Sequence, residues 1–297
     1  MAEQLKTFRG NCHCGAYVYE VKLPEKFGTT DCNCSSCYKK GALWVVPKNE
    51  DLHFVKGDVD TLTNYTFGRK TFNHKFCSNC GVQLMIVGHI DPPKPGEVKE
   101  PMTGINVRTF QYGQGVNVWD IERTPLDGKS FGAPYEPAKF TGPEPTAEIE
   151  GAKVYTGSCH CGAVRVALKS KPLTKDSKDS IMECSCSICN RHGSVWLYPK
   201  KNQVVIEGKE NLGVYLFNTK VFGKTFCKIC GIPVHNEPQP ISEERMNELE
   251  EGQRNFLNGS MDIEPINLRL FDDLNVNDLN VAHYDGYNKN PSRYVEP

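Results

Sequence analysis

A pattern of seven cysteines that occurs twice constrains this chain more than any other feature. Each copy reads C-H-C-G, then C-x-C-S-x-C, then F-C-x-x-C-G, and the two copies together use every cysteine of the 297-residue sequence. The first copy comprises Cys12, Cys14, Cys32, Cys34, Cys37, Cys77 and Cys80, and the second comprises Cys159, Cys161, Cys184, Cys186, Cys189, Cys227 and Cys230. A doubled framework of this kind predicts two copies of one small fold in tandem.

The repeat extends beyond the cysteines. Residues 105–110 (INVRTF) match residues 266–271 (INLRLF), and residues 126–128 (LDG) match residues 284–286 (YDG). A proline-bearing stretch with few large apolar residues separates the copies and reads as a short, stiff connector. The predicted organisation is a first domain at residues 1–141, a linker at 142–150 and a second domain at 151–297.

The apolar residues within each copy are mostly spaced two apart, which is typical of strands. We therefore expect a mainly β fold. The predicted strands include residues 16–21, 43–46, 62–67, 82–87, 105–110 and 163–168. A helix is predicted at residues 242–251, where Ser242 can cap the first turn and Gly252 can end it.

Charge and hydropathy favour a small-molecule partner. The chain has 35 basic and 36 acidic residues, and its calculated pI is about 6.7, which argues against a strongly basic nucleic-acid surface. It contains no apolar stretch long enough to span a membrane, and its first ten residues are polar. We therefore expect a cytoplasmic protein with no nucleic-acid or membrane partner, while a protein partner stays open.

Fourteen cysteines in a reducing compartment favour metal binding over disulfides. Seven disulfides are the alternative, but they require an oxidising compartment and do not explain the C-x-C and C-x-x-C spacings. Thiolate tetrahedra suit both zinc and iron, but zinc is preferred because only zinc provides a redox-inert Lewis acid with an exchangeable ligand.

Seven thiols divide into four and three. A structural zinc takes four protein ligands, whereas a reactive zinc keeps one position open. Alternate strand residues share a face, so each C-x-C can act as a chelate, and each C-x-x-C-G turn supplies two more thiolates. The predicted closed sites are the first-half quartet (Cys12, Cys14, Cys77, Cys80) and the second-half quartet (Cys159, Cys161, Cys227, Cys230). The predicted open sites are the first-half triplet (Cys32, Cys34, Cys37) and the second-half triplet (Cys184, Cys186, Cys189).

The order of these motifs, followed by an I-N-V-R type strand, resembles the glutathione-dependent formaldehyde-activating enzyme family, to which centromere protein V also belongs. The resemblance covers both halves, in the manner of tandem fungal members. It implies two β-tent-like zinc domains of small antiparallel sheets, with up to four Zn²⁺ per chain. It also implies a carbon-sulfur lyase that acts on glutathione adducts such as S-hydroxymethylglutathione, with the six triplet cysteines as catalytic residues.

An open zinc could bind a thiol such as glutathione and make it more acidic. Three thiolates leave such a site negative, so nearby cations would help. Lys39 and Lys40 follow the first triplet, and Arg191 and His192 follow the second. We expect Lys39 and Arg191 to offset this charge or to hold a glutathione carboxylate. Basic surface residues beside a turn are the alternative.

The chain departs from the commoner family form next to both triplets. Tyr38 and Asn190 stand where many members have arginine, and Asn33 and Ser185 stand where histidine is found. These changes concern the substrate rather than the metal.

Histidines near the cysteines are expected to be structural. His74 aligns with Lys224, so an acid or base role for it would belong to one half only. A partly exposed structural histidine is the preferred interpretation. His13 and His160 should point away from the quartets as packing residues.

Two other functions remain open. A non-catalytic zinc scaffold that presents a surface to a protein partner would need only the quartets. A related enzyme that releases glutathione or another thiol from a biosynthetic adduct would use the same open zinc.

Overall fold

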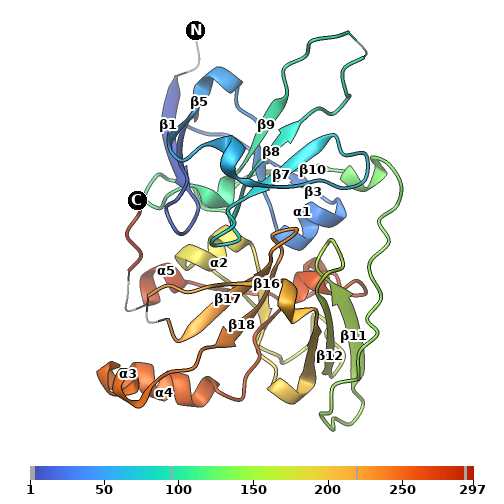
Figure 1. Ribbon diagram of the computed structural model, residues 1–297, viewed down its shortest axis with the longest axis vertical. Helices are drawn as coiled ribbons and strands as arrows, with labels where there is room; N and C mark the ends of the chain where they lie inside the picture. The colour runs from blue at the N-terminus through green and yellow to red at the C-terminus, as the bar shows by residue number, and fades with distance from the viewer. Residues whose placement is uncertain (1–3, 95, 219, 291–292) are drawn as a thin grey trace.

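The computed structural model describes residues 4–94, 96–218, 220–290 and 293–297. It is mainly β, and the two halves form similar units, as the sequence predicts. Figure 1 shows the first half above the second, with the connecting chain running down one side. None of the helices found in the described residues combines the length and the apolar character that crossing a membrane requires.

The first half contains β1 (Leu5–Asn11), β2 (Val18–Pro24), β3 (Thr29–Cys32), β4 (Trp44–Val45), β5 (Leu52–Lys56), β6 (Thr63–Tyr65), β7 (Phe72–Phe76), β8 (Gln83–Gly88), β9 (Met102–Asn106) and β10 (Arg123–Leu126). The second half contains β11 (Lys153–Ser158), β12 (Arg165–Ser170), β13 (Met182–Cys184), β14 (Val195–Leu197), β15 (Val204–Glu207), β16 (Leu212–Tyr215), β17 (Phe222–Cys227), β18 (Pro233–Pro238), β19 (Ile266–Asn267) and β20 (Ala282–Tyr284). The helices are α1 (Ser35–Lys40), α2 (Ser187–His192), α3 (Glu243–Glu248), α4 (Glu251–Ser260) and α5 (Gly286–Lys289).

Each half has one three-stranded and one seven-stranded sheet with the same strand order. The small sheets are β1-β2-β5 and β11-β12-β15. The large sheets are β10-β3-β4-β9-β8-β7-β6 and, read in the matching direction, β20-β13-β14-β19-β18-β17-β16. The sheets are mainly antiparallel, as expected, and each large sheet has one parallel edge, where β10 pairs with β3 and β20 with β13. The repeated L/Y-D-G segment begins at the last residue of this parallel edge strand, where Leu126 pairs with Cys32 and Tyr284 pairs with Cys184.

The predicted strands are largely present, with one exception. Residues 105–110 begin in β9 but continue as a 3₁₀ turn, Val107–Thr109. Asn106 causes the change, because its side-chain oxygen accepts a hydrogen bond from the backbone N–H of Arg108 at 3.3 Å.

The helix predicted at residues 242–251 starts where expected, after Ser242, but it ends earlier, at Glu248. Ser242 caps α3 by accepting from the backbone N–H of Arg245 at 3.2 Å. Gly252 does not end a helix but lies inside α4. A capping box between Glu250 and Gln253 starts this new helix and offsets the cost of an internal glycine.

The two halves pack against each other through matched residues. A side chain at Gly81 would meet the ring of Phe226 at 2.4 Å, and one at Gly231 would meet the ring of Phe76 at 2.8 Å. Both glycines have positive φ, +71° and +70°, and both follow the last cysteine of a quartet. The phenylalanine of each F-C-x-x-C-G motif therefore packs on the glycine of the other motif. Residues 141–147 already lie against the second half, and the linker bounds at 142–150 stay a prediction.

Candidate metal centres

The cysteines gather into two quartets and two triplets, the groups that their spacing predicts. All fourteen are free thiols, which excludes the disulfide alternative for this structure. Within the first-half quartet the sulfur atoms of Cys12 and Cys14 lie 3.6 Å apart, and those of Cys14 and Cys77 lie 3.5 Å apart. A tetrahedron with Zn–S bonds of about 2.3 Å has edges of about 3.8 Å. The quartets could therefore hold zinc with little rearrangement.

The C-x-C chelate of each quartet is built by a turn, not by a strand as predicted. β1 ends at Asn11, and the backbone N–H of Gly15 then bonds to the carbonyl of Cys12 at 3.0 Å. Gly15 has a φ of +69°, a conformation in which glycine is favoured. The turn brings the sulfurs of Cys12 and Cys14 to one side while His13 points away toward the second half.

Each triplet is built around the start of a short helix. Cys32 ends β3, Cys34 is the residue that caps α1, and Cys37 lies within α1. The second-half triplet has the same arrangement around β13 and α2. In the described part of the chain, no further His, Cys, Asp or Glu ligand atom joins either triplet. Each triplet could therefore hold a metal ion whose fourth position is left to a small molecule.

A glycine that the sequence reasoning gave no role lies against each triplet. A Cβ atom at Gly128 would approach the sulfur of Cys32 to 2.3 Å, and one at Gly286 would approach the sulfur of Cys184 to 2.4 Å. These glycines end the repeated L/Y-D-G segment, so the match between halves was the signal that could have found them. Only glycine allows the backbone to approach the first sulfur of each triplet this closely.

The two triplets differ in the residue that faces the third cysteine. In the second half the ammonium of Lys224 lies 3.8 Å from the sulfur of Cys189. Hydrogen bonds with Cys184 and Cys186, together with this charge, hold the pKa of Cys189 well below its ordinary value.

His74 takes the place of Lys224 in the first half and is buried, not partly exposed as predicted. The side-chain amide of Gln83 donates to Nδ1 of His74 at 3.0 Å, and burial lowers the pKa of His74 well below its ordinary value. Hydrogen bonds with Cys32 and Cys34 raise the pKa of Cys37. The neutral His74 therefore gives no counterpart to the Lys224 ammonium at this strand position, and the cation whose charge acts on Cys37 in this half is the buried Lys40.

Lys39 and Arg191 do not face a ligand, contrary to expectation. Lys39 is 3% exposed, and its ammonium donates to the carbonyls of Ser158 and Leu270 and to the carboxylate of Asp272, at 3.1, 2.8 and 2.8 Å. These partners all belong to the second half. A lysine held in this way cannot receive a glutathione carboxylate.

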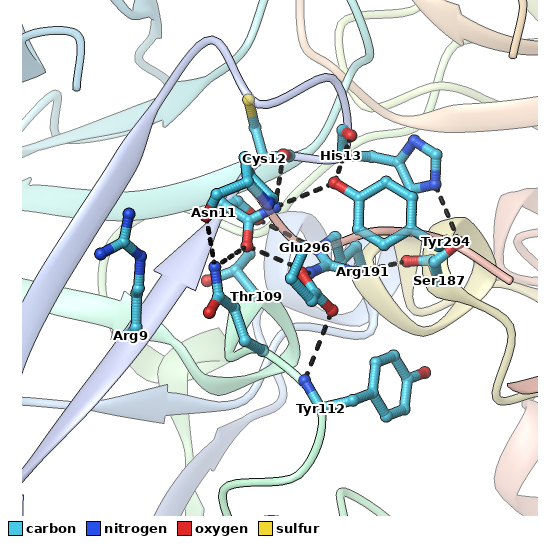
Figure 2. Close-up of polar contacts among 12 residues, drawn as sticks. Arg9, Asn11, Cys12, His13, Thr109, Tyr112, Ser187, Arg191, Tyr294 and Glu296 are labelled. Atoms are coloured by element: carbon cyan, nitrogen blue, oxygen red, sulfur yellow. Dashed lines mark hydrogen bonds and ion pairs between the residues drawn. The ribbon is translucent and has the colours of Figure 1, made fainter. Parts of the chain in front are cut away.

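Arg191 makes the reciprocal contacts in the first half. It is 1% exposed and donates to the backbone and side-chain oxygens of Asn11 at 3.1 and 3.3 Å. It also pairs with Glu296 at 2.6 Å, as Figure 2 shows. Lys39 and Arg191 therefore join the halves rather than contact a substrate.

His13 and His160 are packing residues and not part of either quartet's ligand set, in line with the sequence interpretation. Burial lowers the pKa of His13 to about 3 and that of His160 to about 4, so both rings are neutral near pH 7.

Arg108 forms an ion pair with a buried acid of the second half. Its guanidinium lies 2.8 Å from the carboxylate of Glu183, and both side chains are buried. The pair joins the first half to the residue that precedes Cys184 in the second half.

Comparison with known proteins gives one family and one solved structure. A family model described as glutathione-dependent formaldehyde-activating enzyme matches the chain twice, at residues 7–110 and 154–252. A crystal structure of a Rhodobacter sphaeroides protein is 24% identical and covers 41% of this chain and 93% of its own length, with a TM-score of 0.31.

Proposed function

Because the chain belongs to the glutathione-dependent formaldehyde-activating enzyme family, we propose that it is a zinc-dependent carbon-sulfur lyase acting on glutathione adducts. The observation that carries this proposal is the pair of triplets, each of which lacks a fourth protein ligand among the described residues. A purely structural metal would need four ligands, and the quartets already provide them. The quartets are assigned to folding and the triplets to chemistry.

The net reaction is addition of a thiol to a carbonyl group, or its reversal. In the forward direction a sulfur-carbon bond forms, the carbonyl π bond breaks, and the thiol proton ends on the carbonyl oxygen as a hydroxyl group. In reverse the carbon-sulfur bond breaks and the hydroxyl proton returns to sulfur. Neither direction requires an oxidant or a reductant. S-hydroxymethylglutathione is the expected adduct when the carbonyl compound is formaldehyde.

The triplet cysteines would hold the metal through their sulfurs. Zinc, when bound, supplies a positive charge that holds the thiol sulfur and favours its deprotonation. The missing side chains of Gly128 and Gly286 let the backbone pack closely against the first sulfur of each triplet and so help to fix its position. The indole N–H of Trp44 donates to the sulfur of Cys37 at 3.3 Å, which reduces the negative charge on that ligand.

Lys224 is the residue best placed to assist a thiolate. Three cysteine thiolates and one Zn²⁺ carry a net charge of about −1, and a fourth thiolate makes it about −2. The ammonium of Lys224, 3.8 Å from the sulfur of Cys189, offsets part of this charge. We assign the stronger thiol binding to the second-half triplet for this reason, and we expect the protein to act in the cytosol on a small thiol or thiol adduct.

Exchange between formaldehyde and glutathione can be measured by ¹³C NMR on the zinc-loaded chain. We expect exchange faster than the uncatalysed rate, a lower rate for Cys186→Ser, and the uncatalysed rate for Cys34→Ser combined with Cys186→Ser. Lys26→Met is a surface control that should leave the rate unchanged. A fully zinc-loaded chain that neither binds glutathione nor accelerates this exchange would contradict the proposal and favour the non-catalytic scaffold.

A further inference from the structure

The helix of the second-half triplet is anchored at both ends by the first half. At its start, Oγ of Ser187 lies 2.9 Å from Nε2 of His13. At its end, Nε2 of His192 lies 2.8 Å from the carbonyl oxygen of Cys80. His13 and Cys80 both belong to the segments that form the first-half quartet. α2 therefore rests on the quartet of the other half.

The helix of the first-half triplet has the mirrored anchors. Oγ of Ser35 lies 2.8 Å from Nε2 of His160, and the ammonium of Lys39 donates to the carbonyl of Ser158 at 3.1 Å. Ser158 directly precedes Cys159 of the second-half quartet. The serine–histidine contacts match between the halves, and the contact of Lys39 with Ser158 matches that of Arg191 with the carbonyl of Asn11 at 3.1 Å, because Asn11 directly precedes Cys12.

Each of these histidines is held rigidly. Nδ1 of His13 lies 2.9 Å from the hydroxyl of Tyr215, and the ring stacks on Tyr294 with centroids 4.4 Å apart. Figure 2 shows the ring of His13 beside Tyr294 with its far nitrogen directed at Ser187. His160 has the same surroundings, with the hydroxyl of Tyr65 at 2.7 Å and the ring of Tyr135 at 4.5 Å. One nitrogen of a neutral imidazole donates and the other accepts, so two hydroxyl groups satisfy both.

The serine that each histidine contacts lies between two triplet cysteines. Ser187 follows Cys186 directly and precedes Cys189 by two positions in the first turn of α2. Ser35 has the same place between Cys34 and Cys37 in α1. A displacement of this serine would displace the sulfurs on both sides of it. Reactive groups are held in place through such supporting hydrogen bonds.

We propose that His13 positions the second-half triplet and that His160 positions the first-half triplet. Each triplet is then supported by the other half, because the segment that carries the quartet of one half holds the triplet of the other half in place. This arrangement is independent of the reaction that the triplets perform. It also means that the position of each triplet depends on residues of the other half.

The test measures thiol alkylation in the full-length, zinc-loaded chain. N-ethylmaleimide labels exposed or loosely held cysteines, and peptide mass spectrometry resolves the rate for each triplet. His13→Phe keeps an aromatic ring but removes both hydrogen bonds. Since a hydrogen bond of this kind contributes roughly 1 kcal/mol, we expect labelling of the second-half triplet to rise about threefold to tenfold. Labelling of the first-half triplet should stay near the wild-type rate.

His160→Phe is the matched variant and should give the opposite pattern. His13→Gln, whose amide retains a donor and an acceptor, should restore part of the protection. A double-mutant cycle adds specificity, because His13→Phe should be non-additive with Ser187→Ala and additive with Ser35→Ala. If His13→Phe raised the labelling rate of the first-half triplet alone, or of both triplets equally, the proposal would be overturned.

The serine variants keep the proposal testable if the phenylalanine variants do not fold. Ser187→Ala leaves Nε2 of His13 without its partner, so labelling of Cys12 and Cys14 should rise while that of Cys159 and Cys161 does not. Ser35→Ala should do the reverse. A rise at Cys159 and Cys161 in Ser187→Ala would overturn the proposal. None of these results depends on lyase activity, so they are independent of the test of the proposed function.

Discussion

The two triplets have the same backbone but different surroundings. In both, a strand, a short helix and a glycine two residues after the parallel edge strand arrange three sulfurs in the same way. In the first half Ile86 packs against the triplet, and its partner position on the neighbouring strand carries the buried, neutral His74. In the second half the same strand positions carry Asn236 and Lys224. The duplicated chain has therefore kept the geometry that can hold a metal ion and moved the nearby cation: Lys224 lies 3.8 Å from the sulfur of Cys189, whereas the cation that acts on Cys37 is the buried Lys40.

The comparison separates metal capacity, which the two halves share, from thiolate affinity, which differs between them. Metal capacity depends on the sulfurs and the turns that carry them, and these are alike in both halves. Affinity for a charged thiolate depends on the neighbouring side chains, and these are not alike. We expect equal zinc occupancy in the two triplets and tighter binding of an anionic thiol in the second.

The largest effect separates quartets from triplets. Cys77→Ser removes one of four ligands from a closed site, and the free energy of structural zinc binding is also free energy of folding. We expect loss of the cooperative thermal transition, followed by circular dichroism, and loss of zinc from the chain. Cys34→Ser, in a triplet, should keep the transition and lose about one zinc. Similar losses of structure in both variants would contradict the distinction.

The next effect compares the acids that precede the two triplets. Glu183 is buried in an ion pair with Arg108, whereas Asp31, at the matching position, is 45% exposed in its side chain and lies 3.6 Å from Arg123. Removing one partner of a buried pair leaves the other charge uncompensated, so Glu183→Gln should lower the free energy of unfolding by about 3 kcal/mol. Asp31→Asn should cost less than about 1 kcal/mol. Urea denaturation measures both, and equal costs would show that the halves do not differ here.

A third comparison tests the space beside each triplet. Gly286→Ala places a methyl group where the sulfur of Cys184 lies, and Gly128→Ala does the same to Cys32. Each change should lower zinc affinity of its own triplet by about tenfold to 100-fold, the range typical of residues that support metal ligands. Competition with a chromophoric chelator measures this loss. Gly259→Ala, at an exposed glycine of α4 with open space around it and an ordinary φ, is the matched control and should leave zinc affinity unchanged.

The smallest effect concerns the charge that distinguishes the triplets. Lys224→Met removes the ammonium near Cys189 while keeping an unbranched side chain. We expect glutathione binding at the second-half triplet to weaken by about fivefold to tenfold, because the site is partly exposed and its charges are screened. His74→Met should change binding at the first-half triplet by less than about twofold. Titration calorimetry on variants with the other triplet inactivated separates the two sites.

Local features of the site could be predicted from the sequence, and contacts between the halves could not. The division into quartets and triplets follows from spacing, because each chelate is made by residues close together along the chain. The contact between His13 and Ser187 joins residues 174 positions apart, and no local pattern records it. Lys39 looks like a surface residue after a turn for the same reason, since its partners Ser158 and Asp272 lie in the other half.

The fold shows the same limit. Alternating apolar residues predict β2 and β12, whose hydrogen-bonded partners lie nearby in the chain. The parallel pairing of β10 with β3 brings together segments about ninety residues apart and was not foreseen. Duplication itself was the remaining clue: the repeated L/Y-D-G segment marked this strand and its glycine before either had a known role.

The central claim is that each triplet holds zinc with a fourth position that a visiting thiol completes. X-ray absorption at the zinc edge tests it directly on the purified chain. The account predicts about four zinc ions per chain and an average of about 3.5 sulfur ligands per zinc, rising to about 4 when glutathione is added. An average of 4 before glutathione is added, an average that glutathione does not change, or only two zinc ions per chain would contradict it.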